Sequence, residues 1–186
     1  MASARTDRIQ LHELSFRPFL AEAEIKDRVT QLGQELAYRL AGGAPSFLVM
    51  LRGAFVFAAD LIRASGMDGE VSFVRTSSYK GTDTEGKVRM HLAPEAGAVK
   101  GKDVVLIEDI VDSGLTMQAF LPELKKLEPK SITLVTLLHK PEAQRVEVDI
   151  DLVGFVIPPK FVVGYGLDYD GRGRHLAGIW QLAEDF

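Results

Sequence analysis

The sequence predicts an α/β fold in which a doubly wound, mainly parallel sheet is flanked by helices. Short apolar runs with the length of strands alternate with stretches of helical spacing along the chain. The clearest run, residues 104–107, is apolar at every position and mostly β-branched. Such a strand is buried on both faces, as in a parallel sheet that helices cover on both sides.

The same patterns place the elements in chain order. Residues 21–40 carry apolar side chains three or four positions apart with charges between them, which predicts an amphipathic helix that ends at Gly42 and Gly43. The other predicted elements are strand 46–51, helix 54–64, strand 71–78, a polar hairpin loop 79–87, strand 88–92, a strand that ends at Asp109, helix 115–127, strand 132–138, and the apolar segments 151–157 and 161–167. No repeat or linker interrupts them, so we expect a single domain over residues 1–186.

Composition is that of an ordinary globular protein. Of the 186 residues, 46% are hydrophobic and 26% are charged, and the formal net charge is −4. This acidic balance gives no electrostatic reason to expect nucleic acid as a partner. The chain has no cysteine, which excludes a disulfide framework, a thiolate nucleophile and a zinc–thiolate site. No apolar run has membrane-spanning length and the N-terminus lacks the apolar core of a signal peptide, so we expect a cytoplasmic protein without a membrane partner.

Polar residues gather where the central strand gives way to a helix. Open α/β sheets place their ligands at such junctions. Ser113, Gly114 and Thr116 offer hydroxyls and approachable backbone N–H groups at the predicted helix N-terminus. This combination suits a phosphate monoester.

Three carboxylates precede this loop within five residues. Glu108 and Asp109 can accept hydrogen bonds from sugar hydroxyls or bind a hard cation such as Mg²⁺, and Asp112 is a possible base. An acidic strand end followed by a helix cap is the alternative interpretation. Because carboxylates against a buried strand are costly to place, we favour the functional interpretation.

Two further junctions hold candidate residues. Arg52 and Gly53 follow strand 46–51, and the glycine allows close backbone approach to an anion, although a plain tight turn explains it equally well. Lys140 follows strand 132–138, so parallel topology puts it on the same edge of the sheet as Asp109. A lysine in that place is often only a surface residue.

The stretch 108–116 resembles the phosphoribosyl-diphosphate (PRPP) signature of the type I phosphoribosyltransferases. The resemblance implies that Glu108 and Asp109 hold the ribose hydroxyls, directly or through Mg²⁺, and that residues 113–116 cradle the 5′-phosphate. Leu115 stands at the free position of this loop, where only its backbone can serve the phosphate. Arg52 and Gly53 would form the pyrophosphate loop, which in the family often has a cis peptide before the glycine.

The segment 158–169, Pro-Pro-Lys-Phe-Val-Val-Gly-Tyr-Gly-Leu-Asp-Tyr, resembles the base-binding hood of the 6-oxopurine (hypoxanthine-guanine) phosphoribosyltransferases. The resemblance implies that Phe161 stacks on the purine and that Val162 reads the base edge through its backbone. Asp168, beside the base, would hold a second magnesium at the pyrophosphate, which Arg174 would contact. Without the resemblance, the segment would be an ordinary core strand.

Together these residues predict a purine-salvage enzyme of the glycosyltransferase (pentosyltransferase) class. It would convert PRPP and hypoxanthine or guanine into IMP or GMP and pyrophosphate, with Mg²⁺ as cofactor. Asp112 would act as general base at purine N7. Lys140 would bind the 6-oxo group, because an ammonium has three donors and no acceptor and would meet a 6-amino group donor to donor.

The resemblance also implies an architecture. We expect a core of about residues 21–140, a hood formed by about 141–186 with N-terminal residues, and a lid at about 79–87 that begins after Ser78 with Tyr79. The alternative for the lid is an exposed flexible hairpin. The family predicts a homodimer or homotetramer.

Two other functions compete with this prediction. A PRPP-sensing regulator keeps the fold and the central motif without turnover, but it would need a basic nucleic-acid face, which the net charge does not favour. A phospho-acceptor receiver domain also gathers carboxylates and a lysine at strand ends. It has no use for the Ser-Gly-x-Thr loop or for the hood.

Overall fold

A computed structural model of the chain describes residues 8–78, 88–94 and 96–183. Its centre is a six-stranded sheet in the order β5-β4-β3-β6-β7-β8, in which every neighbouring pair is parallel except β4 and β5. The strands are β3 (Ser46–Leu51), β4 (Glu70–Ser78), β5 (Val88–Leu92), β6 (Asp103–Val111), β7 (Ser131–His139) and β8 (Leu152–Val156). This arrangement confirms the predicted mainly parallel sheet.

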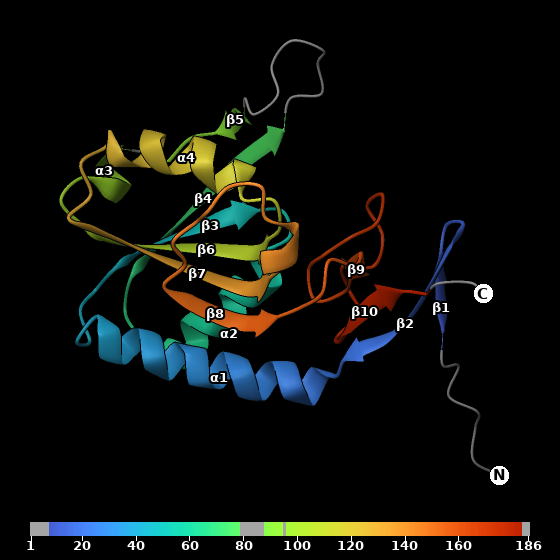
Figure 1. The fold of residues 1–186 in the computed structure, drawn as a ribbon. Coiled ribbons are helices and arrows are strands. Elements are labelled where there is room, and N and C mark those ends of the chain that lie inside the picture. Colours follow the sequence, from blue (N-terminus) through green and yellow to red (C-terminus); the bar gives the residue numbers. More distant parts are fainter. Residues whose placement is uncertain (1–7, 79–87, 95, 184–186) are drawn as a thin grey trace.

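Helices cover both faces of this sheet, as expected for a doubly wound fold (Figure 1). Helices α1 (Glu22–Arg39) and α2 (Phe55–Ser65) lie on one face, and α3 (Ala96–Val99) and α4 (Leu115–Lys125) lie on the other. Each face has its own buried core. Leu36 and Phe57 belong to the core under α1 and α2, and Phe120 belongs to the core under α4.

The order of the strands creates a crevice between β3 and β6. The two strands are neighbours, with Val49 opposite Ile107, but the chain leaves β3 into α2 on one face and β6 into α4 on the other. Two parallel strands whose connections diverge in this way leave an open site beyond their carboxyl ends. Both predicted binding junctions are therefore brought to the same place.

A second, antiparallel sheet lies on the side toward which the parallel strands run (Figure 1). Its order is β1-β2-β10-β9, formed by β1 (Ile9–Leu11), β2 (Leu14–Leu20), β9 (Val162–Val163) and β10 (Ile179–Leu182). The sequence patterns did not predict β1, β2 or β10. Strand β1 has only three residues and pairs with β2 in a local hairpin, whereas β2 and β10 pair across most of the chain length. The role of this small sheet as a hood over the site stays a prediction.

Several predicted boundaries were wrong. Strand β6 continues past Asp109 to Val111, because its last two residues still pair with Leu138 and His139 of β7. Helix α4 ends at Lys125. Within the segment 161–167 only β9 is a strand, since positive φ angles at residues 164–166 turn the chain.

The predicted lid at 79–87 lies outside the described residues. Among the described residues, no helix is long and apolar enough to cross a membrane.

Candidate active site

Most of the predicted site residues meet in one pocket of about 370 Å³ beyond the carboxyl ends of the central strands. Its lining includes Arg52, Gly53, Asp109, Asp112, Lys140, Phe161, Val162, Asp168 and Arg174. An adjoining pocket of about 240 Å³ shares Arg52, Gly53 and Asp109 with the first and also reaches Glu108 and Thr116. The structure thus joins residues of β6 and β9 with residues from the loops that follow β3, β6, β7 and β9.

The two strand-to-helix junctions touch at Gly53 and Asp109. A Cβ atom on residue 53 would lie 1.5 Å from Oδ2 of Asp109, so only glycine fits beside this carboxylate. The peptide bond between Leu51 and Arg52 is cis. Arg52 is exposed and lines both pockets.

Glu108 and Asp109 are carboxylates held in an unfavourable environment. Burial, and then the neighbouring charge of Asp109, raise the pKa of Glu108 well above its usual range. Burial also raises the pKa of Asp109 to about 6. A hydrogen bond from the Ile110 N–H to Oδ1 (3.0 Å) and the charge of Arg174 oppose this rise. Carboxylates whose pKa is shifted in this way are typical of catalytic and ligand-binding sites.

The same pair has the chemistry of a magnesium site. Oε2 of Glu108 is buried and has no hydrogen-bond partner among the described residues, and such an oxygen fits a hard cation or a hydroxyl. The described residues contain no ready cluster of three or more histidine, aspartate or glutamate side chains. Mg²⁺ is commonly bound through one or two carboxylates together with substrate phosphates, which agrees with this donor set.

Asp112 and Lys140 form an ion pair inside the larger pocket. The Lys140 ammonium donates to Oδ2 of Asp112 at 3.0 Å. Lys140 is 5% exposed, whereas the Asp112 side chain is 50% exposed. The register of β6 and β7 causes this meeting, because Val111 lies opposite His139 and the Lys140 N–H bonds to the Val111 carbonyl at 3.0 Å. The sequence predicted a shared edge for Lys140 and Asp109, and the structure adds the direct contact of Lys140 with Asp112.

The predicted phosphate loop leads into α4. Gly114 is the N-cap residue, with φ of +81°, and a Cβ there would lie 2.6 Å from the Val146 carbonyl oxygen. The N-cap glycine has no side chain to satisfy the helix N-terminus, and the Leu115 N–H makes a long hydrogen bond, of 3.5 Å, to the Ser113 hydroxyl. The first turn of α4 therefore keeps backbone N–H groups for an anion. Thr116 lines the smaller pocket. Ser113, Gly114 and Leu115 line neither pocket, although they adjoin Thr116 in the chain.

The residue before β9 of the small sheet contributes an aromatic side chain to the pocket. Phe161 is 42% exposed and meets Tyr169 edge to face, with ring centroids 5.8 Å apart, and Phe16 at 6.1 Å. These contacts hold the ring while leaving part of it free. Val162 is buried in β9, the edge strand of the small sheet, so one side of that strand has no ladder partner among the described strands.

Arg174 joins the tail of the chain to the pocket. Its guanidinium pairs with Oδ1 of Asp168 at 2.6 Å and donates to the Gly166 carbonyl at 2.7 Å. The other oxygen of Asp168 accepts from the Gly171 N–H at 2.7 Å. A carboxylate has about four acceptor positions, so Asp168 retains capacity for a cation.

The comparisons with known proteins agree with this geometry. A model of the phosphoribosyl transferase domain matches residues 20–170. The chain belongs to the phosphoribosyltransferase family. The hypoxanthine phosphoribosyltransferase of Salmonella typhimurium is 43% identical over 166 residues, which cover 88% of this chain and 93% of that protein. This similarity places the chain among the 6-oxopurine members, which are pentosyltransferases.

Solved structures support the same placement. A hypoxanthine-guanine phosphoribosyltransferase of Bacillus anthracis is 35% identical, with a TM-score of 0.84, over 89% of this chain and 98% of that one. A Trypanosoma cruzi hypoxanthine phosphoribosyltransferase is 33% identical, with a TM-score of 0.83, over 94% of this chain and 95% of that one. The latter structure was solved to study the role of the C-terminal region in oligomeric state and enzymatic activity.

The site of this phosphoribosyltransferase also contains residues that the sequence patterns missed. Arg75 and Thr76, near the carboxyl end of β4, line the larger pocket. Arg75 lies opposite Leu51 of β3, so the strand order brings it beside the Arg52–Gly53 loop. The strand order, if known, would have identified Arg75 as a candidate site residue. Ser78 ends β4, whereas Tyr79 lies outside the described residues.

Proposed function

We propose that this phosphoribosyltransferase transfers the 5-phosphoribosyl group of PRPP to N9 of hypoxanthine or guanine, forming IMP or GMP and pyrophosphate. The observation that carries the proposal is the Lys140–Asp112 pair in a pocket that also presents Phe161. A buried ammonium and a carboxylate in contact offer a donor and an acceptor side by side. The 6-oxo group and N7 are neighbours on one edge of a 6-oxopurine, and this pair matches them.

The pair supplies the proton chemistry of the proposed reaction. N9 forms a bond to ribose C1 while the bond from C1 to the pyrophosphate oxygen breaks, and the electron pair leaves with pyrophosphate. The purine loses its N7 proton, which the Asp112 carboxylate accepts as general base. Lys140 donates to the 6-oxo oxygen, and Phe161 holds the plane of the ring. An adenine 6-amino group would face the Lys140 donors without an acceptor.

Each of the remaining sets of residues would bind a different group of PRPP. The N-terminus of α4 and the 113–116 loop would bind the 5′-phosphate, and Glu108 and Asp109 would bind the ribose hydroxyls. The pyrophosphate would lie against Arg52, Gly53 and Arg174. Glu108, Asp109 and Asp168 would hold Mg²⁺, which when bound offsets the negative charge of the departing pyrophosphate.

The wider arrangement of the enzyme is also part of the proposal. We infer that the enzyme works as a homodimer or homotetramer, and the structure of the Trypanosoma cruzi relative was likewise studied for its oligomeric state. The hood role of the small sheet, the lid at 79–87 with Ser78 and Tyr79, and the cytoplasmic location remain predictions.

A base-selection assay tests the proposed function. The protein is incubated with PRPP, Mg²⁺ and one of hypoxanthine, guanine, xanthine or adenine, and nucleotide formation is followed by chromatography. We expect product with hypoxanthine or guanine and little with adenine. Absence of product with every oxopurine would overturn the proposed reaction. Preference for adenine would overturn the role of Lys140, and Lys140→Met, which keeps the length of the side chain without its donors, should lose oxopurine turnover.

A further inference from the structure

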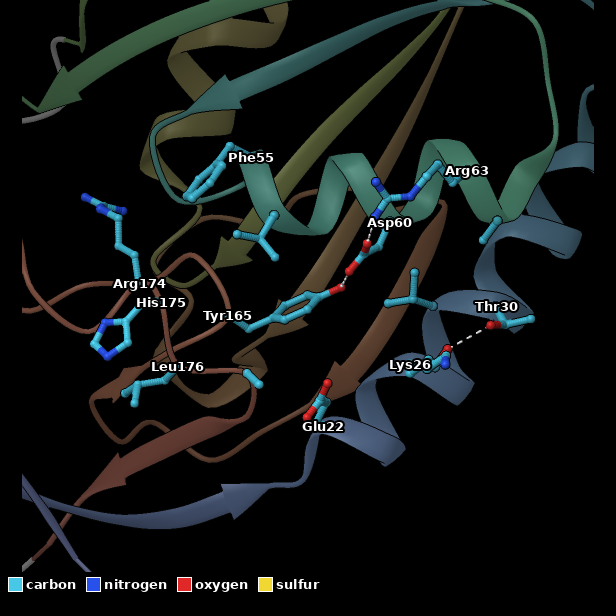
Figure 2. Close-up of a pocket in the computed structure, with 14 residues that line it drawn as sticks. Glu22, Lys26, Thr30, Phe55, Asp60, Arg63, Tyr165, Arg174, His175 and Leu176 are labelled. Carbon is cyan, nitrogen blue, oxygen red and sulfur yellow. Dashed lines mark hydrogen bonds and ion pairs between the residues drawn. The ribbon is translucent and has the colours of Figure 1, made fainter.

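A third and larger pocket, of about 820 Å³, lies beside the active site between α1, α2 and residues 165–177 (Figure 2). The ring of Tyr165 lies along its wall and points toward α2 (Figure 2). The Tyr165 hydroxyl donates to Oδ2 of Asp60 at 2.6 Å, and Arg63 pairs with Oδ1 of the same carboxylate. Asp60 and Tyr165 line this pocket and are not among the residues that line the 370 Å³ pocket.

Tyr165 has an unusual backbone for a residue with a side chain. Its φ is +49°, and its glycine neighbours Gly164 and Gly166 both have φ of +101°. Such a conformation persists where the surrounding structure holds it in place. The side chain is 7% exposed, and burial followed by the hydrogen bond to Asp60 raises the pKa of Tyr165 well above its usual range. The hydroxyl therefore remains a donor at neutral pH.

Asp60 and Tyr165 each belong to a segment that also forms the proposed pyrophosphate end of the site. Asp60 lies on α2, which begins two residues after Gly53. Gly166 packs directly on Gly53, because a Cβ on residue 166 would lie 2.2 Å from the Gly53 carbonyl oxygen. The Gly166 carbonyl in turn accepts from Arg174, which pairs with Asp168.

We propose that Asp60 and Tyr165 are a positioning pair, whose hydrogen bond fixes the Arg52–Gly53 loop against the segment that carries Asp168 and Arg174 and so sets the affinity for the pyrophosphate group. The two segments follow strands of different sheets and meet where the backbones of Gly53 and Gly166 touch. The Asp60–Tyr165 bond ties the two segments together on the outer side of that contact. The inference rests on the proposed assignment of this end of the site to pyrophosphate.

Kinetics of Tyr165→Phe test the positioning pair. Removal of the hydroxyl should raise the KM for PRPP about fivefold while the KM for hypoxanthine stays unchanged, because distant positioning contacts alter binding by roughly that amount. Tyr38→Phe is the matched control, since Tyr38 is 90% exposed on α1 and its hydroxyl should not matter. Equal effects on both KM values, or no effect, would overturn the pair.

Variants of Asp60 separate the hydrogen bond from general damage. Asp60→Asn keeps an acceptor oxygen and should stay close to the parent enzyme, whereas Asp60→Ala should match Tyr165→Phe. The double variant Asp60→Ala/Tyr165→Phe should be no worse than either single one, because both remove the same bond. Additive effects of the two single changes would contradict the proposal. If Tyr165→Phe does not fold, Asp60→Ala against Asp60→Asn decides the question.

A binding measurement keeps this test apart from that of the proposed function. Calorimetric titration with Mg²⁺ and pyrophosphate needs no turnover, and Tyr165→Phe should bind about fivefold more weakly than the parent enzyme. An enzyme that makes no nucleotide yet shows this difference would overturn the proposed reaction and retain the positioning pair. Equal affinities, or no binding of pyrophosphate by the parent enzyme, would overturn the pair.

Discussion

The two ends of strand β6 carry aspartates in opposite circumstances. At the amino end, Asp103 accepts hydrogen bonds from Lys130 at 2.7 Å and Ser131 at 2.6 Å, and these bonds lower its pKa. At the carboxyl end, burial raises the pKa of Asp109 to about 6. The two residues share one strand and the same neighbour, β7. They differ in whether the surrounding chain satisfies the negative charge.

This difference separates a structural carboxylate from one that we propose to be functional. Asp103 has its partners in the folded chain and stabilises it when ionised. Asp109 and its neighbour Glu108 lack sufficient partners, so their ionisation destabilises the fold. A carboxylate in such an environment is expected to gain its partners from a ligand, which in the proposed function is Mg²⁺ or the ribose of PRPP.

The largest effect is expected from a variant that tests whether a residue after the carboxyl end of β6 acts as the general base. Asp112→Asn should lower kcat about 10²–10⁴-fold, because the amide cannot accept the N7 proton. PRPP binding, followed by calorimetry, should remain nearly intact. Asp149→Asn, at an exposed aspartate between β7 and β8, is the matched control. Unchanged turnover in Asp112→Asn would remove Asp112 as the base.

Gly53 provides the next test, because it makes room for Asp109. Gly53→Ala would force a methyl group into the carboxylate, and a displacement of about 1 Å in a catalytic site can lower kcat/KM about 10²-fold. Gly97→Ala adds the same methyl group on α3, where no atom lies within 4 Å, and should have no effect. Steady-state kinetics with varied PRPP compare the two. Equal activities would contradict the close contact of the two junctions.

A smaller effect concerns stability at the carboxyl end. Asp109 binds a proton more tightly in the folded chain, so its contribution to stability is present below its ordinary pKa of 3.8 and is lost as pH rises through about 6. Asp109→Asn never ionises and should therefore raise the free energy of unfolding by about 2 kcal/mol at about pH 8, and by less at about pH 4. Denaturant unfolding without divalent cations measures this difference. A gain that does not grow with pH would show that Asp109 is not destabilising.

The smallest effect has the opposite sign and lies at the amino end. The lowered pKa of Asp103 stabilises the fold above its ordinary pKa, and this contribution is lost as pH falls through the lowered value. Asp103→Asn should therefore lower the free energy of unfolding at neutral pH, by less than about 1 kcal/mol because exposed ion pairs contribute little. The same unfolding experiment serves both variants. A stabilising effect of Asp103→Asn would remove the contrast between the two ends.

Local patterns predicted much of the fold. The buried strands β3 and β7, the amphipathic helix α1 and the strand-to-helix junction after β6 were all placed to within about two residues. Strand β10 escaped prediction, because it acquires its pairing with β2 only when the two ends of the chain meet. The turn at Tyr165 escaped as well, since its left-handed backbone depends on the packing of Gly166 against Gly53.

The sequence by itself determined which chemical groups are present and where the chain turns from strand to helix. Those properties depend on neighbours a few residues away, so the carboxylates 108–112 and the following Ser-Gly-x-Thr loop could be recognised directly. Only the tertiary structure decided that Lys140 pairs with Asp112, 28 residues away, and that Gly53 touches Asp109. Strand order and register bring these atoms together, and both are set by the packing of the whole sheet.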